Sequence, residues 1–411
     1  MDQYGKFADD IHSGKIVAAY VPDRHGVVPA VSKMAFGNGM GVKICTCVDK
    51  SDLFAPGFGD IIAEVPADKV DALTIEYKVI GEVTDDAAIT YGDMTISLAD
   101  AVETWKAPLE KVFASVAGVD APTPVEEKLY NADSIYVCKN KIAKPTVFIP
   151  VFPGTNCEYD SARAVEKAGA EAEIFVIRNL TAEDVARSVE GFSAKVRESQ
   201  MIFIPGGFSG GDEPDGSAKF ITAFFRNPAV KEAVTDLLDN RDGLMCGICN
   251  GFQALIKLGL VPYGKIIDTD ENCPTLTFNT INRHQSKLVR TRVASNKSPW
   301  LKNTKVDEIY TVPISHGEGR FVAPAKVLQE LFDNGQVFTQ YVDENGQPTM
   351  VSPYNPNGSM CAIEGIVSKD GRVLGKMAHS ERQGENRNKN IYGEMDQKLF
   401  EAGVNYFKKA K

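Results

Sequence analysis

The chain has 411 residues, of which 43% are hydrophobic and 24% charged, and its formal net charge is −10. At roughly 100–200 residues per domain, this length predicts two or three domains. The acidic balance without a long basic run argues against nucleic acid as a partner. No apolar stretch reaches the roughly 18 residues of a membrane span, and the first residues lack the basic and apolar regions of a signal peptide.

The cysteines predict reduced thiols rather than a disulfide framework. They are spread along an acidic chain in which no export signal is found, a pattern typical of cytoplasmic proteins. We therefore expect a cytoplasmic location. The eight cysteines are Cys45, Cys47, Cys138, Cys157, Cys246, Cys249, Cys273 and Cys361.

Residues 1–119 are expected to form an α+β domain, because several short strands precede a closing helix. The strands are predicted at 17–21, 42–48, 61–65 and 95–97, with a loosely alternating segment at 74–80. The helices are predicted at 30–36 and 98–113, and Pro108 should interrupt the second.

Residues 120–145 have the composition of a linker. Pro122, Pro124 and Pro145 bracket a polar stretch that contains lysine and glutamate. Such stretches are typical of boundaries between domains.

Residues 146–411 alternate between strand and helix patterns and predict a doubly wound, mostly parallel sheet. The predicted strands are 146–152, 173–177, 201–204 and 244–247, and the predicted helices include 161–168 and 253–258. Thr181 and Asp184 have the spacing of a capping box that opens another helix. Sites in such sheets form at the carboxyl ends of the strands.

The strongest local motif is Gly247-Ile248-Cys249-Asn250-Gly251, which follows the last of these strands. A nucleophile on a tight strand-to-helix turn needs glycine neighbours so that strand and helix pack closely. The helix N-terminus favours the thiolate of Cys249. The Asn250 N–H is a candidate donor to an oxyanion.

Two other interpretations of Cys249 stay open at this stage. It could be a buried structural cysteine, or Cys246 and Cys249 could form a redox or zinc pair. Cys246 lies within the apolar strand rather than at the turn, and neither a second CxxC nor a close histidine pair completes a zinc site. We therefore expect no metal.

A glycine-rich loop follows the strand at 201–204. It reads PGGFSGGD at 205–212, and its backbone can approach a ligand closely because glycine has no side chain. We expect Gly206 or Gly207 to supply a second oxyanion N–H. A flexible turn and a phosphate loop are the alternatives, although the lysine of a Walker motif is missing.

A cysteine nucleophile needs a base, and the base needs a partner that orients it. Among the five histidines, His379 and His316 each precede a glutamate by two residues, Glu381 and Glu318. The spacing alone does not separate these two pairs.

Six motifs together give the region 146–411 a family resemblance. This region resembles class I (triad) glutamine amidotransferases with a flavodoxin-like fold, and it is especially similar to the glutaminase that ends the large form of phosphoribosylformylglycinamidine synthases. The motifs are FPGTNC at 152–157, PGGFSGGD at 205–212, GICNGFQ at 247–253, SHGEGR at 315–320, YNPNGS at 354–359 and DGRVLG at 370–375.

The resemblance implies which histidine is the base. The terminal His-Pro-Glu-Arg motif of the family falls on residues 379–382, with Ser380 in place of proline. The implied triad is therefore Cys249, His379 and Glu381.

The resemblance implies further roles for residues outside the triad. His316 and Glu318 would line the ammonia path towards the synthetase, while Phe208 and Gln253 would contact glutamine. Cys157 would belong to a structural turn.

Residues 29–41 and 80–84 resemble the C-terminal domain of aminoimidazole ribonucleotide synthase-like proteins. This implies that residues 1–119 are one part of a synthetase whose other domains, or a partner subunit, lie elsewhere. The substrate would be L-glutamine, and its ammonia would serve the ATP-dependent conversion of formylglycinamide ribonucleotide to formylglycinamidine ribonucleotide in purine biosynthesis. The glutaminase needs no cofactor, whereas the complete synthase would need ATP and magnesium.

Two rival functions remain open. The same turn occurs in cysteine peptidases and chaperone-like hydrolases of the related superfamily. The chain could also be a catalytically idle scaffold.

Overall fold

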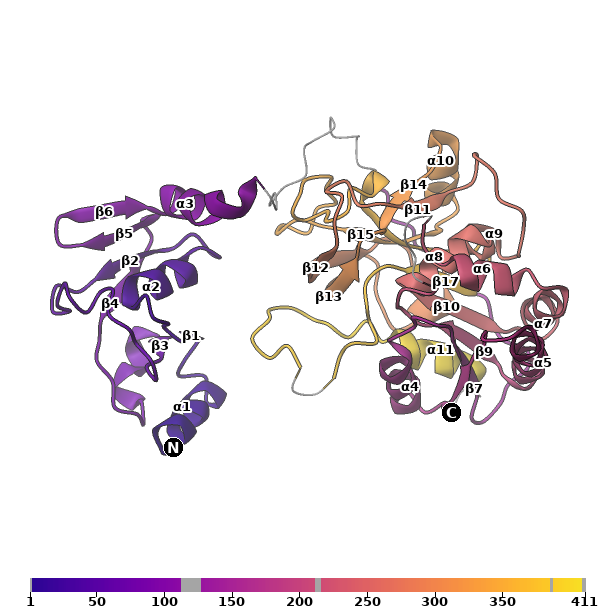
Figure 1. The fold of residues 1–411 in the computed structure, drawn as a ribbon, viewed down its shortest axis with the longest axis horizontal. Coiled ribbons are helices and arrows are strands. Elements are labelled where there is room, and N and C mark those ends of the chain that lie inside the picture. Colours follow the sequence, from indigo (N-terminus) through magenta and orange to yellow (C-terminus); the bar gives the residue numbers. More distant parts are fainter. Residues whose placement is uncertain (1, 112–126, 211–215, 385–386, 409–411) are drawn as a thin grey trace. The chain divides into compact units, whose positions relative to one another are not determined.

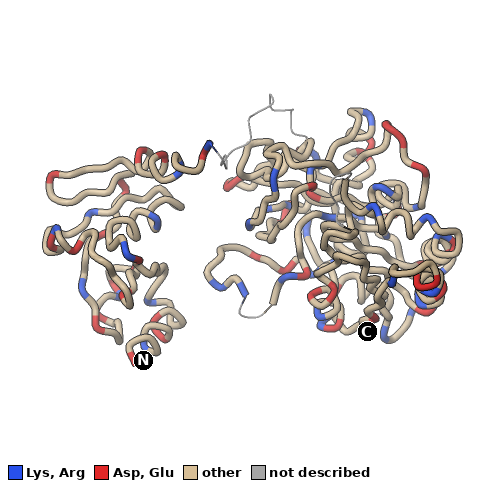
Figure 2. Tube along the Cα trace, viewed as in Figure 1, with Lys and Arg blue, Asp and Glu red and all other residues tan. Residues whose placement is uncertain are grey.

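The computed structural model describes residues 2–111, 127–210, 216–384 and 387–408. The chain divides into two compact units, Met1–Ser115 and Val116–Lys411 (Figure 1). Among the described residues, no helix combines the length and apolar character that crossing a membrane requires. Acidic and basic residues are interspersed in both units, and the described chain shows no extended basic stripe (Figure 2).

The first unit has a four-stranded sheet of order β4-β2-β5-β6 and a separate pair, β1-β3. Its buried apolar core includes Ile44 on β2, Ile89 on β5 and Leu98 on α3. The elements are α1 (Asp2–His12), β1 (Ala18–Tyr20), α2 (Val27–Ala35), β2 (Gly41–Ile44), β3 (Ile62–Glu64), β4 (Gly81–Thr84), β5 (Ala88–Tyr91), β6 (Met94–Ser97) and α3 (Leu98–Glu110).

Three predictions for this unit are wrong. Residues 74–80 form no strand, and the strand begins only at Gly81. Pro108 lies inside α3 without interrupting it, and the helix continues to Glu110. Cys45 and Cys47 form a disulfide, since the turn after β2 brings their Cα atoms to 5.1 Å, while the other six cysteines are free.

The second unit is built on a nine-stranded sheet of order β13-β12-β15-β16-β17-β10-β9-β7-β8. The strands are β7 (Thr146–Val151), β8 (Glu171–Val176), β9 (Met201–Ile204), β10 (Leu244–Ile248), β12 (Gln285–Val293), β13 (Ile309–His316), β15 (Val337–Tyr341), β16 (Ile363–Val367) and β17 (Val373–Lys376). A second pair consists of β11 (Thr275–Thr277) and β14 (Arg320–Val322).

The expectation of a mostly parallel sheet is corrected. Four neighbouring pairs are parallel and four are antiparallel. The parallel half runs from β8 to β17. The antiparallel half adds β12, β13, β15 and β16. These strands follow α8 (Asn250–Lys257) and lack the regular strand–helix alternation from which the parallel sheet was predicted.

Helices cover the parallel half of the sheet (Figure 1). α4 contacts α11, and α5 contacts α7. The predicted capping box is confirmed, because Thr181 and Asp184 cap α5 reciprocally. The helices are α4 (Glu158–Lys167), α5 (Ala182–Glu198), α6 (Lys219–Phe225), α7 (Pro228–Asp239), α8 (Asn250–Lys257), α9 (Leu260–Tyr263), α10 (Ala325–Asp333) and α11 (Leu399–Phe407).

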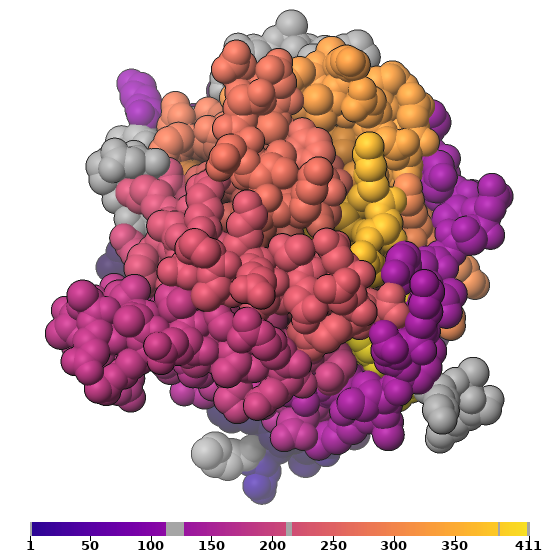
Figure 3. Space-filling model, turned by 90° about the vertical axis from the view of Figure 1, so that its right-hand side faces the viewer, coloured from indigo at the N-terminus to yellow at the C-terminus, as the bar shows by residue number. Residues whose placement is uncertain are grey.

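The expected linker lies partly outside the described residues, and its described part belongs to the second unit. The Tyr136 hydroxyl donates a 2.7 Å hydrogen bond to Asp242, and Cys138 is buried. Lys141 donates to the Tyr406 carbonyl at 2.6 Å. In Figure 3 this purple segment lies beside the yellow C-terminal segment. Residues 130–142 are therefore structural, because their polar and aromatic side chains find partners on the rest of the second unit.

Candidate active site

Cys249 occupies a strained turn between β10 and α8. Its φ of 55° and ψ of −107° place it in a region that side chains other than glycine rarely adopt. The Cys249 N–H donates a 2.9 Å hydrogen bond to the Lys376 carbonyl, which helps to hold the turn. The sequence-predicted nucleophile thus stands at the carboxyl end of a parallel strand and at the N-terminus of a helix.

The two glycines of this turn are required by close packing. A Cβ on Gly247 would lie 2.6 Å from the Gly251 backbone, and a Cβ on Gly251 would lie 2.0 Å from the Ile204 carbonyl oxygen. Cys246 points into the core instead, where burial raises the pKa of its thiol. Its burial disfavours the redox or zinc pair.

His379 and Glu381 form a buried charged pair. Their Nδ1 and Oε1 atoms are 2.6 Å apart, and both side chains are at most 1% exposed. Burial acts to lower the pKa of His379, but the Glu381 carboxylate outweighs it and the pKa lies well above its ordinary value. Burial likewise acts to raise the pKa of Glu381, and His379 reverses that shift, so its pKa is lowered. The pair is therefore suited to carry an imidazolium.

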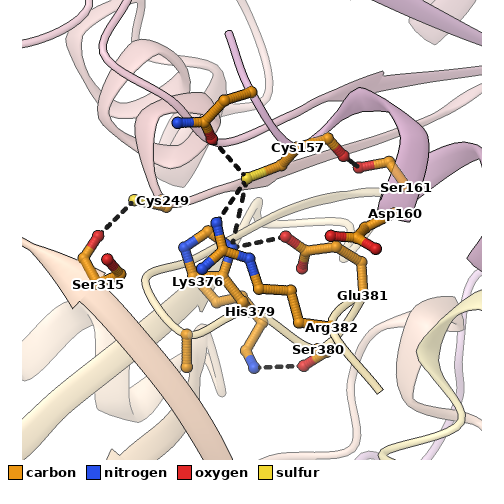
Figure 4. Close-up of polar contacts among 12 residues, drawn as sticks. Cys157, Asp160, Ser161, Cys249, Ser315, Lys376, His379, Ser380, Glu381 and Arg382 are labelled. Carbon is orange, nitrogen blue, oxygen red and sulfur yellow. Dashed lines mark hydrogen bonds and ion pairs between the residues drawn. The ribbon is translucent and has the colours of Figure 1, made fainter. Parts of the chain in front are cut away.

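The nucleophile and the pair meet around Gly206. A Cβ at this glycine would lie 2.8 Å from His379 Cε1, 3.1 Å from Cys157 Sγ and 3.4 Å from Cys249 Cβ. The Cys249 thiol donates to the Ser315 carbonyl at 3.6 Å, and His379 Nε2 has no hydrogen-bond partner among the described residues (Figure 4). The structure thus brings the three predicted residues together with the sulfur turned towards Ser315.

Cys157 has more than the structural role expected from the sequence. It does stand at the start of α4, but its Sγ also lies 3.9 Å from His379 Nδ1 and accepts a 3.0 Å hydrogen bond from Arg382 (Figure 4). Nothing in the spacing of the FPGTNC motif points to a residue more than two hundred positions away. This contact could only be found in three dimensions.

Cys157, His379 and Glu381 also have the residue types of a metal site. Their ligand atoms lie within 4.8 Å of one another. The Arg382 guanidinium donates to the same sulfur, and Glu381 already accepts from His379. A cation next to the sulfur and an occupied carboxylate disfavour a metal ion here.

The outer edge of β13, the side away from β12, supports both reacting groups. The Pro313 carbonyl accepts a 2.8 Å hydrogen bond from the His379 N–H, and the Ser315 carbonyl accepts the Cys249 thiol. Carbonyls two residues apart on a strand point to the same side. β13 is the last strand of the sheet, so the antiparallel half must curl back to bring this edge to the end of β10.

A pocket of about 150 Å³ opens beside Cys249. Six residues predicted from the sequence line it, namely Gly207, Phe208, Cys249, Gln253, His316 and Glu318. Its volume suits a small molecule rather than a folded partner.

Hydrogen bonds join the walls of this pocket. Gln253 donates to the Glu318 carbonyl at 2.5 Å and accepts from the Asn250 side chain at 2.9 Å. The Asn250 side chain also accepts from the Ser209 N–H at 3.2 Å, which links the nucleophile turn to the glycine-rich loop. The Glu318 carboxylate accepts from the Ser217 N–H at 3.0 Å.

Sequence reasoning missed one wall of the pocket. Phe278, Asn282, Arg283 and His284 lie in the connection between β11 and β12 and face the same space. His284 was one of five histidines, but it lacks the glutamate spacing that singled out two others. No local pattern identifies this connection.

Comparison with known domain families gives one match to the greater part of the chain. The CobB/CobQ-like glutamine amidotransferase domain matches residues 144–410.

Curated relatives match the same region. The chain is 36% identical over 239 residues to phosphoribosylformylglycinamidine synthase subunit PurQ of Methanococcus maripaludis, which covers 58% of this chain and 82% of that protein. It is 33% identical over 281 residues to the subunit of the same name from Treponema denticola, covering 64% of this chain and 99% of that protein. Among solved structures, PurLQS from Thermotoga maritima is similar at 27% identity with a TM-score of 0.46, covering 64% of this chain and 100% of the matched one.

Proposed function

The chain belongs to the CobB/CobQ-like glutamine amidotransferase family, and we propose that it hydrolyses glutamine through a triad of Cys249, His379 and Glu381. One observation carries this proposal. A cysteine in a strained strand-to-helix turn packs around Gly206 together with a buried histidine–glutamate pair, beside a pocket of small-molecule size.

The first half of the reaction forms a thioester. The Cys249 thiol turns from the Ser315 carbonyl towards the unprotonated Nε2 of a neutral His379 ring and gives up its proton to it, which forms the imidazolium. The sulfur then attacks the carboxamide carbon of glutamine, and the C–N bond breaks as His379 returns the proton to the leaving ammonia. Glu381 stabilises the imidazolium between these steps.

Backbone N–H groups hold the developing oxyanion. The proposed donors are Asn250 and either Gly206 or Gly207, each worth about 3–4 kcal/mol. In the second half, His379 activates a water molecule, which attacks the thioester and releases glutamate.

Four side chains of the pocket have proposed roles with the substrate or product. Phe208 and Gln253 contact glutamine, while His316 and Glu318 lie where released ammonia would begin its path to a synthetase. Their place in the lining of the pocket beside Cys249 supports these roles.

The ammonia is proposed to serve the ATP-dependent conversion of formylglycinamide ribonucleotide to formylglycinamidine ribonucleotide. The names of the relatives, which are subunits of phosphoribosylformylglycinamidine synthase, support this use. Residues 1–119 would be an aminoimidazole ribonucleotide synthase-like portion of the synthetase, with residues 120–145 leading to the glutaminase at 146–411. ATP and magnesium would bind the remaining synthetase domains or subunit rather than the glutaminase.

The test combines turnover with covalent labelling. We expect the wild-type chain to release ammonia from glutamine, and we expect Cys249→Ser to abolish release. Because a glutaminase can be idle without its synthetase, a diazoketone analogue of glutamine is added and the modified residue is located by mass spectrometry. The expected adduct is on Cys249. Turnover by the Cys249→Ser variant, or an adduct on another cysteine, would contradict the triad, and cleavage of a peptide instead would favour the rival hydrolase.

A further inference from the structure

His316 is a buried imidazole that faces the pocket without a partner. Its side chain is 1% exposed, it lines the pocket next to Cys249, and neither ring nitrogen has a hydrogen-bond partner among the described residues. Buried polar groups are nearly always hydrogen-bonded, so an unpartnered pair of ring nitrogens that borders a cavity points to a ligand.

The ring is held firmly and in its neutral form. A Cβ on Gly319 would lie 2.4 Å from His316 Cε1, which shows how closely the backbone packs on the ring. Burial, followed by the nearby His379 and His284, lowers the pKa of His316 to about 3. At neutral pH the ring therefore offers one N–H donor and one acceptor nitrogen.

The position of His316 along the pocket indicates which end of a ligand it meets. Phe208 and Phe278 are 47% and 43% exposed, whereas Cys249 and His316 are 4% and 1% exposed. A substrate therefore enters past the phenylalanines, and its reacting end reaches the buried wall. The zwitterionic end of an amino acid would stay near the mouth, where water still reaches it.

We propose that His316 is a further substrate-contacting residue, which accepts a hydrogen bond from the carboxamide nitrogen of glutamine. This inference rests on the proposed glutaminase function. The carboxamide oxygen is directed to the oxyanion donors. The two N–H groups of the carboxamide nitrogen therefore need acceptors elsewhere. The Ser315 carbonyl lies 3.6 Å from Cys249 Sγ, and the His316 ring borders the same pocket as Cys249, so both offer acceptors on the side of the nucleophile.

The contact would select an amide over an ester. The γ-methyl ester of glutamate has the same reacting carbon and the same oxygen, but no N–H on its leaving group. The informative quantity is therefore the ratio of kcat/KM for glutamine to kcat/KM for this ester. A change in this ratio reports on the leaving group, because weaker binding of the amino-acid end or general damage to the site lowers kcat/KM for both substrates.

The experiment compares His316→Phe, His316→Asn and wild type, each checked for cooperative unfolding. Phenylalanine keeps the ring shape against Gly319 but removes both nitrogens, and the ratio is expected to fall about 10- to 100-fold. Asparagine keeps an acceptor on a shorter side chain, and a smaller fall is expected. Tyr406→Phe is the matched control, since it removes a buried hydroxyl that donates to the Asp242 carbonyl at 2.9 Å and does not line the pocket, and the ratio should stay unchanged.

The outcomes separate this inference from the function on which it rests. Equal losses on both substrates, or a ratio within about threefold of wild type in the folded variants, would overturn the contact with the amide nitrogen. If His316→Phe does not fold, the ratio of His316→Asn decides alone. A wild-type chain that hydrolyses neither substrate and takes no label at Cys249 would instead reject the glutaminase function.

Discussion

Lys376 donates a hydrogen bond of 2.7 Å to the hydroxyl of Ser380, the residue between the proposed base and its carboxylate. Gln397 accepts from both of these side chains, at 2.8 Å from Lys376 and 2.6 Å from Ser380. Glu364 lies 3.8 Å from the ammonium group, and both charged side chains are fully buried. The segment that carries His379 and Glu381 is thus braced from the core by a lysine.

Removing this lysine should destabilise the second unit strongly. Lys376→Met leaves Glu364 buried without its cation, and breaking a buried pair in this way costs about 3–5 kcal/mol. Urea unfolding measures the loss. Lys398→Met is the matched control, since Lys398 is 43% exposed and its pair with Asp396 lies at the surface. The free energy of unfolding of that control should fall by at most about 1 kcal/mol. Equal losses in the two variants would show that the buried Lys376 contributes no more to stability than a surface lysine.

Gly206→Ala should impair catalysis through crowding alone. The added methyl group would lie 2.8 Å from His379 Cε1 and 3.4 Å from Cys249 Cβ, so one of these groups must move. A displacement of about 1 Å at a reacting group costs about 100-fold in rate, measured as kcat/KM for glutamine. Gly384→Ala is the control, because its nearest neighbour atom would be 3.8 Å away. Full activity of the Gly206 variant would contradict the packing described here.

Glu381→Gln should change how stability depends on pH. The raised pKa of His379 contributes stability that is complete below its ordinary value of 6.5 and is lost as the pH rises towards the folded value. The lowered pKa of Glu381 contributes stability that is complete above its ordinary value of 4.5 and is lost as the pH falls. The advantage of wild type over the variant should therefore be largest between these two values.

Denaturant unfolding of both proteins from pH 4 to pH 9 provides the measurement. A difference that grows as the pH rises above neutrality has the opposite sign to the one expected and would show that His379 is not stabilised as an imidazolium by Glu381.

Two thiols flank the base, and only one should react. Cys157→Ser keeps an oxygen that can accept from Arg382, so we expect it to retain glutamine hydrolysis and full labelling by the diazoketone. Cys249→Ser should lose about 10⁴- to 10⁶-fold in kcat, as removal of a nucleophile does in other hydrolases. If Cys157→Ser lost labelling while Cys249→Ser was still labelled in full, the assignment of the nucleophile would be reversed.

The sequence by itself was sufficient for the nucleophile turn and the parallel half of the sheet. The glycines at 247 and 251 meet a local steric requirement, since a Cβ at either position of the Cys249 turn would clash with the backbone. The strand and helix patterns on either side of the turn are likewise properties of short segments. The capping box at Thr181 is local in the same way. Such features depend on residues a few positions apart, so a single sequence contains them.

Only the tertiary structure decided what surrounds Cys249. His379, Cys157 and the carbonyl of Ser315 come from segments far apart in the chain, and their meeting depends on how the antiparallel half of the sheet curls to bring β13 to the end of β10. The pocket wall at 278–284 has the same origin. Register and curvature are set by the packing of the whole sheet, whose energy no short segment determines, and for that reason these contacts were beyond the reach of sequence periodicity.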